Sequence, residues 1–180
     1  MSFKLLGSLN PHGGPLLRSE IVANSVVVRE LQSLNVNSSG FLRLSIANVP
    51  IFGHVAAIQT DKGVGLETDG TAGADTGTFA GVYTVASDNQ TVAKVRAVCD
   101  ISKETLYSVD PDAAIGTTAG SNLLGFKTVL ATSTATSESS ASTANGEYNI
   151  WGVDPGVAAN QVVSILTSQM FGGHAVDDVI

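Results

Sequence analysis

The sequence predicts an all-β protein, a compact β-barrel or β-sandwich with an extended amino-terminal arm and long loops rich in Gly, Ser and Thr. Three observations predict this class: apolar and polar residues alternate in several short segments, turn-forming residues cluster between them, and no window carries an apolar stripe at helical spacing with caps at both ends. A βαβ architecture is disfavoured because the crossover helices that it needs cannot be found.

The clearest strand pattern spans residues 91–101. Its apolar side is Ala93, Val95, Ala97, Cys99 and Ile101, and its polar side is Lys94, Arg96 and Asp100. A period of two over this length predicts a strand with one face in water. The other expected strands, rich in Val, Ile, Thr and aromatic residues, are 21–30, 41–47, 50–59, 78–86, 105–109, 123–130, 147–153 and 161–169.

Loop chemistry separates these strands at 68–77, 87–90 and 116–122. Asn145-Gly146 predicts a tight hairpin turn just before the strand at 147. Residues 131–144 (ATSTATSESSASTA) have no large apolar side chain to bury, which predicts a mobile loop. We therefore expect an arm at 1–19, a β-rich domain at 20–171 containing this loop, and a carboxy-terminal tail at 172–180.

The first seventeen residues fit an arm better than a strand, because Asn10-Pro11 and Gly13-Gly14-Pro15 interrupt their apolar positions. Such an arm exposes apolar surface unless it folds back on its own domain or lies on another molecule, and the sequence leaves both alternatives open. The candidate partner contacts are Phe3, Leu5, Leu6, Leu9, Leu16 and Leu17.

Composition narrows the class of partner. The chain has 180 residues, 9 Lys plus Arg, 16 Asp plus Glu and a net charge of -7, which removes the attraction to phosphate that non-specific nucleic-acid binding needs. At this length one core can form without disulfides or metals. The first ten residues lack the apolar run of a signal peptide, and the most apolar longer window, 45–58, is too short for a membrane span. We expect neither a nucleic-acid nor a membrane partner.

The histidines and the cysteine give no catalytic or metal-binding pattern. His12, His54 and His174 lie far apart, without a ligand spacing such as His-x-x-x-His, and are read as a loop, a strand and a tail histidine. Cys99 lies within a strand on its apolar side, where a nucleophile is poorly exposed, and is read as a buried filler.

The remaining motif candidates also fail. The loop carboxylates Asp61, Glu67, Asp69 and Asp75 lack the EF-hand order, so we read them as solvated side chains. Residues 116–121 lack the Lys of a phosphate loop, and no Gly-x-Ser-x-Gly elbow is present. Trp151, next to Tyr148 in an expected strand, is read as core or interface rather than as a sugar platform. The sequence therefore predicts no catalytic residue, metal or cofactor.

From about residue 20 onward, the order of features resembles that of the head decoration, or capsid cement, proteins of tailed bacteriophages. The segments that carry the resemblance are SVVVR (25–29), IFGHVAAIQ (51–59), the 92–100 strand, AIGTTAGSNLLG (114–125) and VVSIL (162–166). They match in style and order and not as one diagnostic motif.

The resemblance implies a structural, non-enzymatic virion protein on the outer surface of the capsid, made in the host cytoplasm and added during assembly. It implies a homotrimer or related cluster that bridges subunits of the major capsid protein, with the amino-terminal arm touching the shell. Alternatives are another virion component such as a tail or fibre protein, a carbohydrate-binding or adhesive module using Trp151, Tyr148 and loop carboxylates, or a hydrolase with His54 or His174 beside an acid.

Overall fold

The structure is a computed structural model, and it describes residues 3–9, 15–47, 49–60, 82–112, 126–137 and 146–165. Nearly all regular structure in these ranges is β-strand, and the single helix among them, α1 (Asn89–Val92), is four residues long. The prediction of an all-β chain is confirmed.

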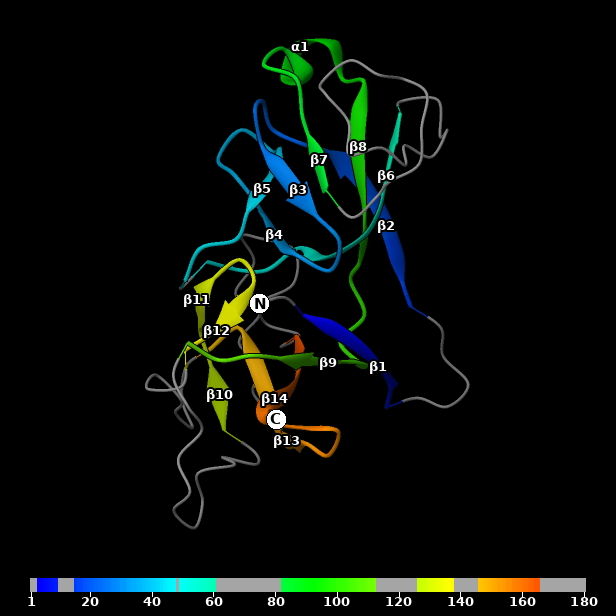
Figure 1. The fold of residues 1–180 in the computed structure, drawn as a ribbon. Coiled ribbons are helices and arrows are strands. Elements are labelled where there is room, and N and C mark those ends of the chain that lie inside the picture. Colours follow the sequence, from blue (N-terminus) through cyan, green and yellow to red (C-terminus); the bar gives the residue numbers. More distant parts are fainter. Residues whose placement is uncertain are drawn as a thin grey trace, which may run out of the picture.

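The described strands form two five-stranded antiparallel sheets, which lie one above the other in Figure 1. In spatial order, the lower sheet contains β1 (Lys4–Ser8), β9 (Thr105–Val109), β14 (Val157–Ile165), β13 (Tyr148–Asp154) and β10 (Lys127–Thr128). The upper sheet contains β2 (Leu17–Ile21), β8 (Val95–Asp100), β6 (Gly53–Thr60), β4 (Ser33–Val36) and β5 (Leu42–Leu44). Two smaller pairs flank them, β3 (Val27–Arg29) with β7 (Val82–Thr84) and β11 (Leu130–Thr132) with β12 (Ala135–Thr136).

The upper sheet curls until its two ends touch. Val22, just after β2, forms a parallel bridge with Leu42 of β5, and the amide of Ala23 donates a hydrogen bond of 2.7 Å to the Leu42 carbonyl. The contact is one bridge and not a ladder, so within the described residues the sheet does not close into a barrel. The bridge lies beside the end of β2 at Ile21, and the rest of the β2 edge has no strand partner among the described residues.

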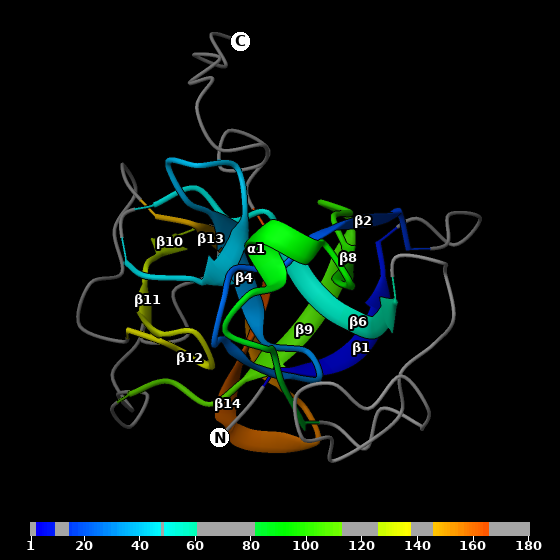
Figure 2. The same cartoon turned by 90° about the horizontal axis from the view of Figure 1, so that it is seen from above.

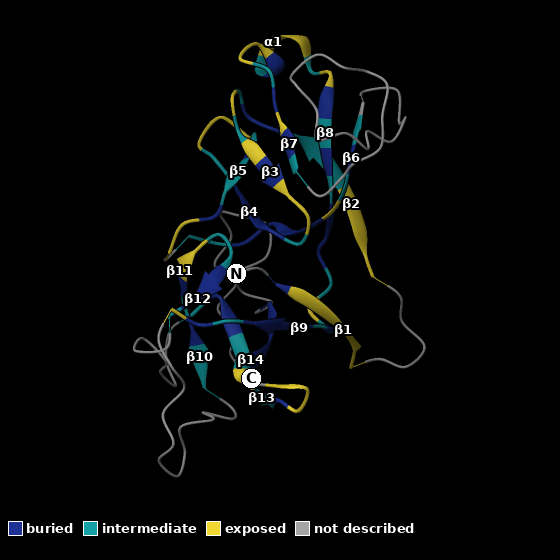
Figure 3. Cartoon of the chain, in the orientation of Figure 1, coloured by how far each residue is buried: buried dark blue, intermediate teal, exposed yellow. Residues whose placement is uncertain are grey.

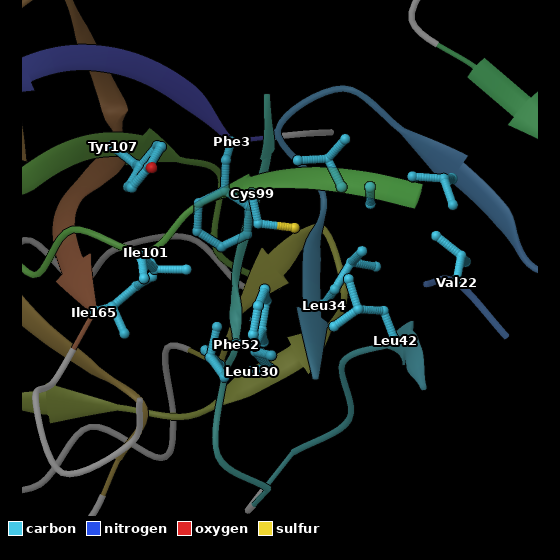
Figure 4. Packing of buried hydrophobic residues seen from close by; sticks show 14 of the residues in the cluster. Phe3, Val22, Leu34, Leu42, Phe52, Cys99, Ile101, Tyr107, Leu130 and Ile165 are labelled. Carbon is cyan, nitrogen blue, oxygen red and sulfur yellow. The ribbon is translucent and has the colours of Figure 1, made fainter. Parts of the chain in front are cut away.

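One hydrophobic core joins the two sheets. It combines residues of the upper sheet, such as Val22, Leu34 and Cys99, with residues of the lower sheet, such as Tyr107 and Ile165 (Figure 4). Because both sheets contribute buried side chains to the same cluster, they stabilise each other through shared apolar burial.

The amino-terminal residues are strands and not an arm, which corrects the prediction for 1–19. β1 pairs with β9, and β2 pairs with β8, so each is the first strand at one edge of its sheet. Residues 10–14, with most of the prolines and glycines on which the arm prediction rested, lie outside the described residues. Of the two alternatives for this segment, the described part packs on its own domain.

Residues 131–137 also differ from the prediction of a mobile loop over 131–144. They belong to the β11–β12 pair, and the carbonyl of Ser133 accepts hydrogen bonds from the Ser33 amide at 3.0 Å and the Ser33 hydroxyl at 3.1 Å. Ala135 and Thr136 are buried. Small hydroxyl side chains thus allow close backbone packing here. The rest of the predicted loop, 138–144, and the predicted tail, 172–180, lie outside the described residues.

The predicted strand at 91–101 begins later than expected. Its first residues lie in α1 and in the left-handed backbone of Ala93, with φ of 52°. The buried side chain of Asn89 fixes this turn: its amide donates to the carbonyls of Val22 and Val95, and its carbonyl accepts from the Val95 amide. Asp100, expected in water, is buried.

The glycine of Asn145-Gly146 has a role that the turn prediction did not include. A Cβ atom at Gly146 would lie 2.7 Å from both the backbone nitrogen and the backbone oxygen of Thr128 in β10. The backbone segments at Gly146 and Thr128 approach so closely that any residue other than glycine would require one of them to move. Asn145, and with it the predicted turn, lies outside the described residues.

Candidate functional site

The most distinctive surface feature is a row of exposed leucines along the amino-terminal strands. We call it the leucine edge, and it consists of Leu5, Leu6, Leu9, Leu16 and Leu17. Leu5, Leu16 and Leu17 are 54%, 59% and 51% exposed. Figure 3 shows β1 and the first part of β2 as exposed, and Figures 1 and 2 both place these strands on the same side of the molecule.

Backbone hydrogen bonds hold the leucine edge against the connection between the two sheets. The Leu9 amide donates to the Glu104 carbonyl at 2.8 Å, and the Leu16 carbonyl accepts from the Ile101 amide at 2.8 Å. Because β8 runs into β9 through these residues, β1 and β2 flank one continuous stretch of chain. The leucines are consequently presented by a supported backbone.

Phe3 does not belong to this surface, which corrects its assignment as a partner contact. Its side chain is 1% exposed and points into the core (Figure 4). Its ring lies 4.3 Å from that of His54 and 5.4 Å from that of Tyr148, between centroids. Phe3 therefore anchors β1 to the core, while the five leucines after it remain exposed.

The polar groups with catalytic chemistry gather elsewhere, in a buried cluster between the sheets. His54, in β6 as the sequence predicted, is fully buried, and its ring lies tilted against the Tyr107 ring, with 4.1 Å between the centroids. Its Nδ1 lies 2.8 Å from the Leu31 carbonyl oxygen, and its Nε2 lies 2.9 Å from the hydroxyl of Tyr148. Since a carbonyl oxygen can only accept, Nδ1 carries the proton, and Tyr148 donates to Nε2.

Burial sets the protonation of this cluster. It lowers the pKa of His54 to about 4, although the Leu31 carbonyl and the charge of Asp100 oppose the shift. Burial also raises the pKa of Tyr107, and the Asp100 carboxylate beside it raises it further. The Tyr107 hydroxyl donates to Asp100 Oδ2 at 2.9 Å, and the Ser102 amide donates to Oδ1 at 2.9 Å.

The cluster is thus a set of polar groups that satisfy one another inside the core. His54 stays neutral near pH 7. The hydrogen bonds from Tyr148 to His54 and from Tyr107 to Asp100 join the lower sheet to the upper one. With His54, Tyr107 and Tyr148 each no more than 1% exposed, no surface is available on them for a substrate in this structure. The hydrolase alternative needs His54 or His174 beside an acid; the burial of His54 gives its first form no support, and His174 lies outside the described residues.

Cys99 lies where the sequence reading put it, whereas Trp151 lies outside the core. Cys99 is buried within β8 among apolar residues, and burial raises the pKa of its thiol above the usual range, which keeps it protonated. Trp151 in β13 is 44% exposed, and its Nε1 donates to the Ser164 hydroxyl at 2.9 Å. Tyr148, its expected companion in a sugar platform, is buried in the core instead.

Several residues of the sequence analysis lie outside the described ranges: His12, His174, Asp61, Glu67, Asp69, Asp75 and residues 116–121. Among the residues that are described, no group of three His, Cys, Asp or Glu side chains could hold a metal ion. The described ranges also contain no helix with the length and apolar character of a membrane span.

The sequence analysis missed the buried pairing of His54 with Tyr148 and of Tyr107 with Asp100. No local signal marks the first pair, whose members are 94 residues apart in sequence. Comparison with known proteins adds no family: no family model matches the chain, and no curated protein and no solved structure matches it.

Proposed function

We propose that this chain is a non-catalytic structural protein that docks through its leucine edge on a repeating protein surface, namely the outer face of a bacteriophage capsid. The observation that carries the proposal is that five leucines in or beside the edge strands β1 and β2 are exposed, whereas most of the other large apolar side chains of the described residues are buried. Several large apolar side chains exposed on one side of a molecule are typical of an interaction surface.

The composition of the rest of the molecule supports this function. A net charge of -7 keeps free copies apart and disfavours polyanions, whereas uncharged leucines favour contact with protein. The two-sheet core holds the edge strands in place through Phe3 and through the hydrogen bonds of Leu9 and Leu16. A preformed surface loses little conformational entropy when it binds.

The size of the leucine edge favours a repeating target over a single one. Covering the remaining half of each leucine contributes about 1 kcal/mol, or about 5 kcal/mol for all five. Association costs about 4 to 15 kcal/mol in lost freedom of motion, so one isolated edge binds weakly. A capsid offers many equivalent positions, and linked copies that engage several of them dissociate much more slowly. Bridging of major-capsid subunits follows from such multiple attachment.

The test is binding to undecorated shells assembled from the major capsid protein encoded in the same genome. Wild-type protein is expected to co-sediment with them to saturation. The triple variant Leu5→Ser, Leu9→Ser, Leu16→Ser should bind about a hundredfold more weakly, because about 3 kcal/mol of apolar contact is lost. Equal saturation and affinity of the two proteins would exclude the leucine edge as the docking surface.

A matched control separates docking from general surface apolarity. Ile46 is 50% exposed and Val27 is 37% exposed, and neither belongs to the leucine edge. The variant Ile46→Ser, Val27→Ser should bind shells like the wild type. Circular dichroism and urea denaturation must show that all variants fold, so that weaker binding reports on the surface.

A carbohydrate-binding module is the second candidate, and the exposed Trp151 side chain favours it. The Ser164 hydrogen bond fixes the indole on the sheet, where one face could stack on a sugar. Under this alternative, Trp151→Ala abolishes binding to a glycan array while the leucine variants leave it intact. Under capsid docking, Trp151→Ala binds shells like the wild type, and binding to tails or fibres instead of shells would identify another virion component.

A further inference from the structure

Three polar side chains that offer unused hydrogen-bond donors lie together on the strand pair β4–β5. Asn35 of β4 lies directly opposite Arg43 of β5. Ser45 follows two residues later, and its amide continues the pairing by donating to the Ser33 carbonyl at 3.1 Å. Residues two apart in a strand share a face, as do residues opposite each other in neighbouring strands. Asn35, Arg43 and Ser45 therefore form one group, which we call the donor cluster.

The donor cluster lies between the upper sheet and the β11–β12 pair. The turn of that pair contacts the same face of β4, because the Ser33 hydroxyl donates to the Ser133 carbonyl at 3.1 Å. Figures 1 and 2 both place β11 on the opposite side of the molecule from β1, and so away from the leucine edge. Asn35 is 0% exposed and Ser45 is 3% exposed, whereas Arg43 is half-buried. Arg43 is consequently the member of the cluster that solvent reaches.

One hydrogen bond fixes the direction of the Asn35 amide. The Nε of Arg43 donates to Asn35 Oδ1 at 3.0 Å, and since a guanidinium group only donates, the atom that it meets must be the amide oxygen. The Nδ2 of Asn35 then carries two donors, and it is buried without a hydrogen-bond partner among the described residues. The same holds for the hydroxyl of Ser45. Because a buried donor without an acceptor is costly, two of them in one cluster indicate a ligand that supplies acceptors.

The charge of Arg43 narrows the class of ligand. In the part of the chain that the structure describes, its side chain bonds only to Asn35, and no carboxylate forms an ion pair with it. A carboxylate can accept from both terminal nitrogens of a guanidinium group in one plane, and its single negative charge balances that of Arg43. A phosphate carries close to two negative charges, so one arginine would leave part of that charge uncompensated beside buried residues.

We propose that the donor cluster binds a carboxylate group, whose oxygens accept from the Arg43 guanidinium, the Asn35 Nδ2 and the Ser45 hydroxyl. The carboxylate belongs either to a small organic acid or to an acidic side chain of a protein partner, since both present the same group to the cluster. The site does not depend on capsid docking, because it lies away from the leucine edge and binds in the protein alone.

The first test titrates the full chain with sodium acetate and follows the side-chain N–H signals by nuclear magnetic resonance, with sodium chloride at equal ionic strength as the reference. The signals of Asn35 Nδ2 and Arg43 Nε should shift together and saturate in acetate but not in chloride. A second titration uses a blocked tripeptide with a central glutamate: saturation with acetate alone identifies a small acid, and saturation with both identifies an acidic side chain. No saturation with either probe overturns the proposal, and so does phosphate binding that is tighter than acetate binding.

Variants of the three residues test the individual donors. Asn35→Asp keeps the size of the side chain but replaces the Nδ2 donors with a carboxylate that pairs with Arg43, and Arg43→Gln removes the positive charge. Each should weaken acetate binding at least about thirtyfold. Ser45→Ala removes one neutral donor and should weaken it about threefold to tenfold. Because Ser45→Ala also removes a buried hydroxyl without a partner, it is expected to fold, and acetate binding by this variant equal to that of the wild type would overturn the proposal.

A matched control for charge is available in the same sheet. Arg96 of β8 is half-buried like Arg43, and Arg96→Gln changes the net charge by the same amount as Arg43→Gln. This control should bind acetate like the wild type, and acetate should raise the urea midpoint of both proteins, because a ligand that binds only the folded state stabilises it. The midpoints of Asn35→Asp and Arg43→Gln should not respond to acetate. An equal loss of binding in Arg96→Gln and Arg43→Gln would show that net charge attracts acetate, and it would overturn the donor cluster as the site.

Discussion

Lowering the pH from 7 to 5 should destabilise this protein through one buried side chain, His54. In the folded state its ring is enclosed between Phe3 and Tyr107, with Nδ1 donating to the Leu31 carbonyl and Nε2 accepting from Tyr148. A second proton on Nε2 would place a charge in the core and oppose the Tyr148 donor. Unfolding releases the ring into water, where protonation is easy.

The size of the effect follows from the pKa of the two states. Burial lowers the pKa of His54 to about 4, against 6.5 for the unperturbed side chain. The unfolded chain therefore binds more protons than the folded one between these values. The contribution of neutral His54 to the free energy of unfolding is fully present above pH 6.5, decreases as the pH falls, and is lost by pH 4. The total is about 3 kcal/mol, of which about 2 kcal/mol is lost between pH 7 and pH 5.

Urea denaturation followed by circular dichroism at pH 7, 6 and 5 measures this loss. Asp and Glu side chains in water have pKa values of about 4, below this window. Hydrogen bonds with Ser108 and the Gly156 amide hold the pKa of Asp154 below its usual value, which moves its titration further from the range between pH 7 and pH 5. His54→Phe should be less stable at pH 7 but should lose less than about 1 kcal/mol on going to pH 5.

The other two histidines provide the matched control. In the variant His12→Asn, His174→Asn, His54 is the only histidine left, and the loss of about 2 kcal/mol should persist. A wild type with equal free energies of unfolding at pH 7 and 5 would refute the reasoning. So would a His54→Phe variant whose dependence on pH matches that of the wild type.

Three further predictions concern packing and reactivity. Phe3→Ala should lower the free energy of unfolding by about 3 to 5 kcal/mol, because the ring fills the core. Leu5→Ala should cost less than about 1 kcal/mol in the same urea titration, and similar losses for both would contradict the assignment of Phe3 to the core. A Cβ at Gly53 would lie 2.5 Å from a backbone carbonyl oxygen of β8, whereas at Gly156 the nearest atom is 3.4 Å away. Gly53→Ala should therefore cost at least about 1 to 3 kcal/mol, and Gly156→Ala much less; equal midpoints in urea would disprove this close approach. Native Cys99 should react with a maleimide only as fast as the chain unfolds, and rapid labelling without urea would show that the thiol is accessible.

The sequence predicted those strands whose alternation reflects one buried face. The strand at 105–109 has the observed bounds of β9, and the buried side of β8 was assigned correctly. β4 gave no such signal, because its polar residues are buried as well: Ser33 bonds to Ser133, and Asn35 accepts from Arg43. A partner 100 residues away, such as Ser133, leaves no local pattern in the sequence.

The amino-terminal strands were missed for a different reason. Alternation is absent from β1, since all five of its residues are exposed at the edge of the sheet, and its attachment depends on Phe3, which precedes it. Composition identified the leucines and Phe3 together as candidate contacts. Only the pairing of β1 with β9 and of β2 with β8 shows that the leucines are exposed and that the Phe3 ring is buried. Whether a partner covers them stays a prediction.

Electron microscopy of particles carrying this chain tests the central claim most directly, because it locates the protein and the surface by which it attaches. We expect density for the two-sheet fold on the outside of the shell, with β1 and the start of β2 facing the major capsid protein. Density in which the leucine edge faces solvent, or shells that carry no copy of the chain, would contradict the account.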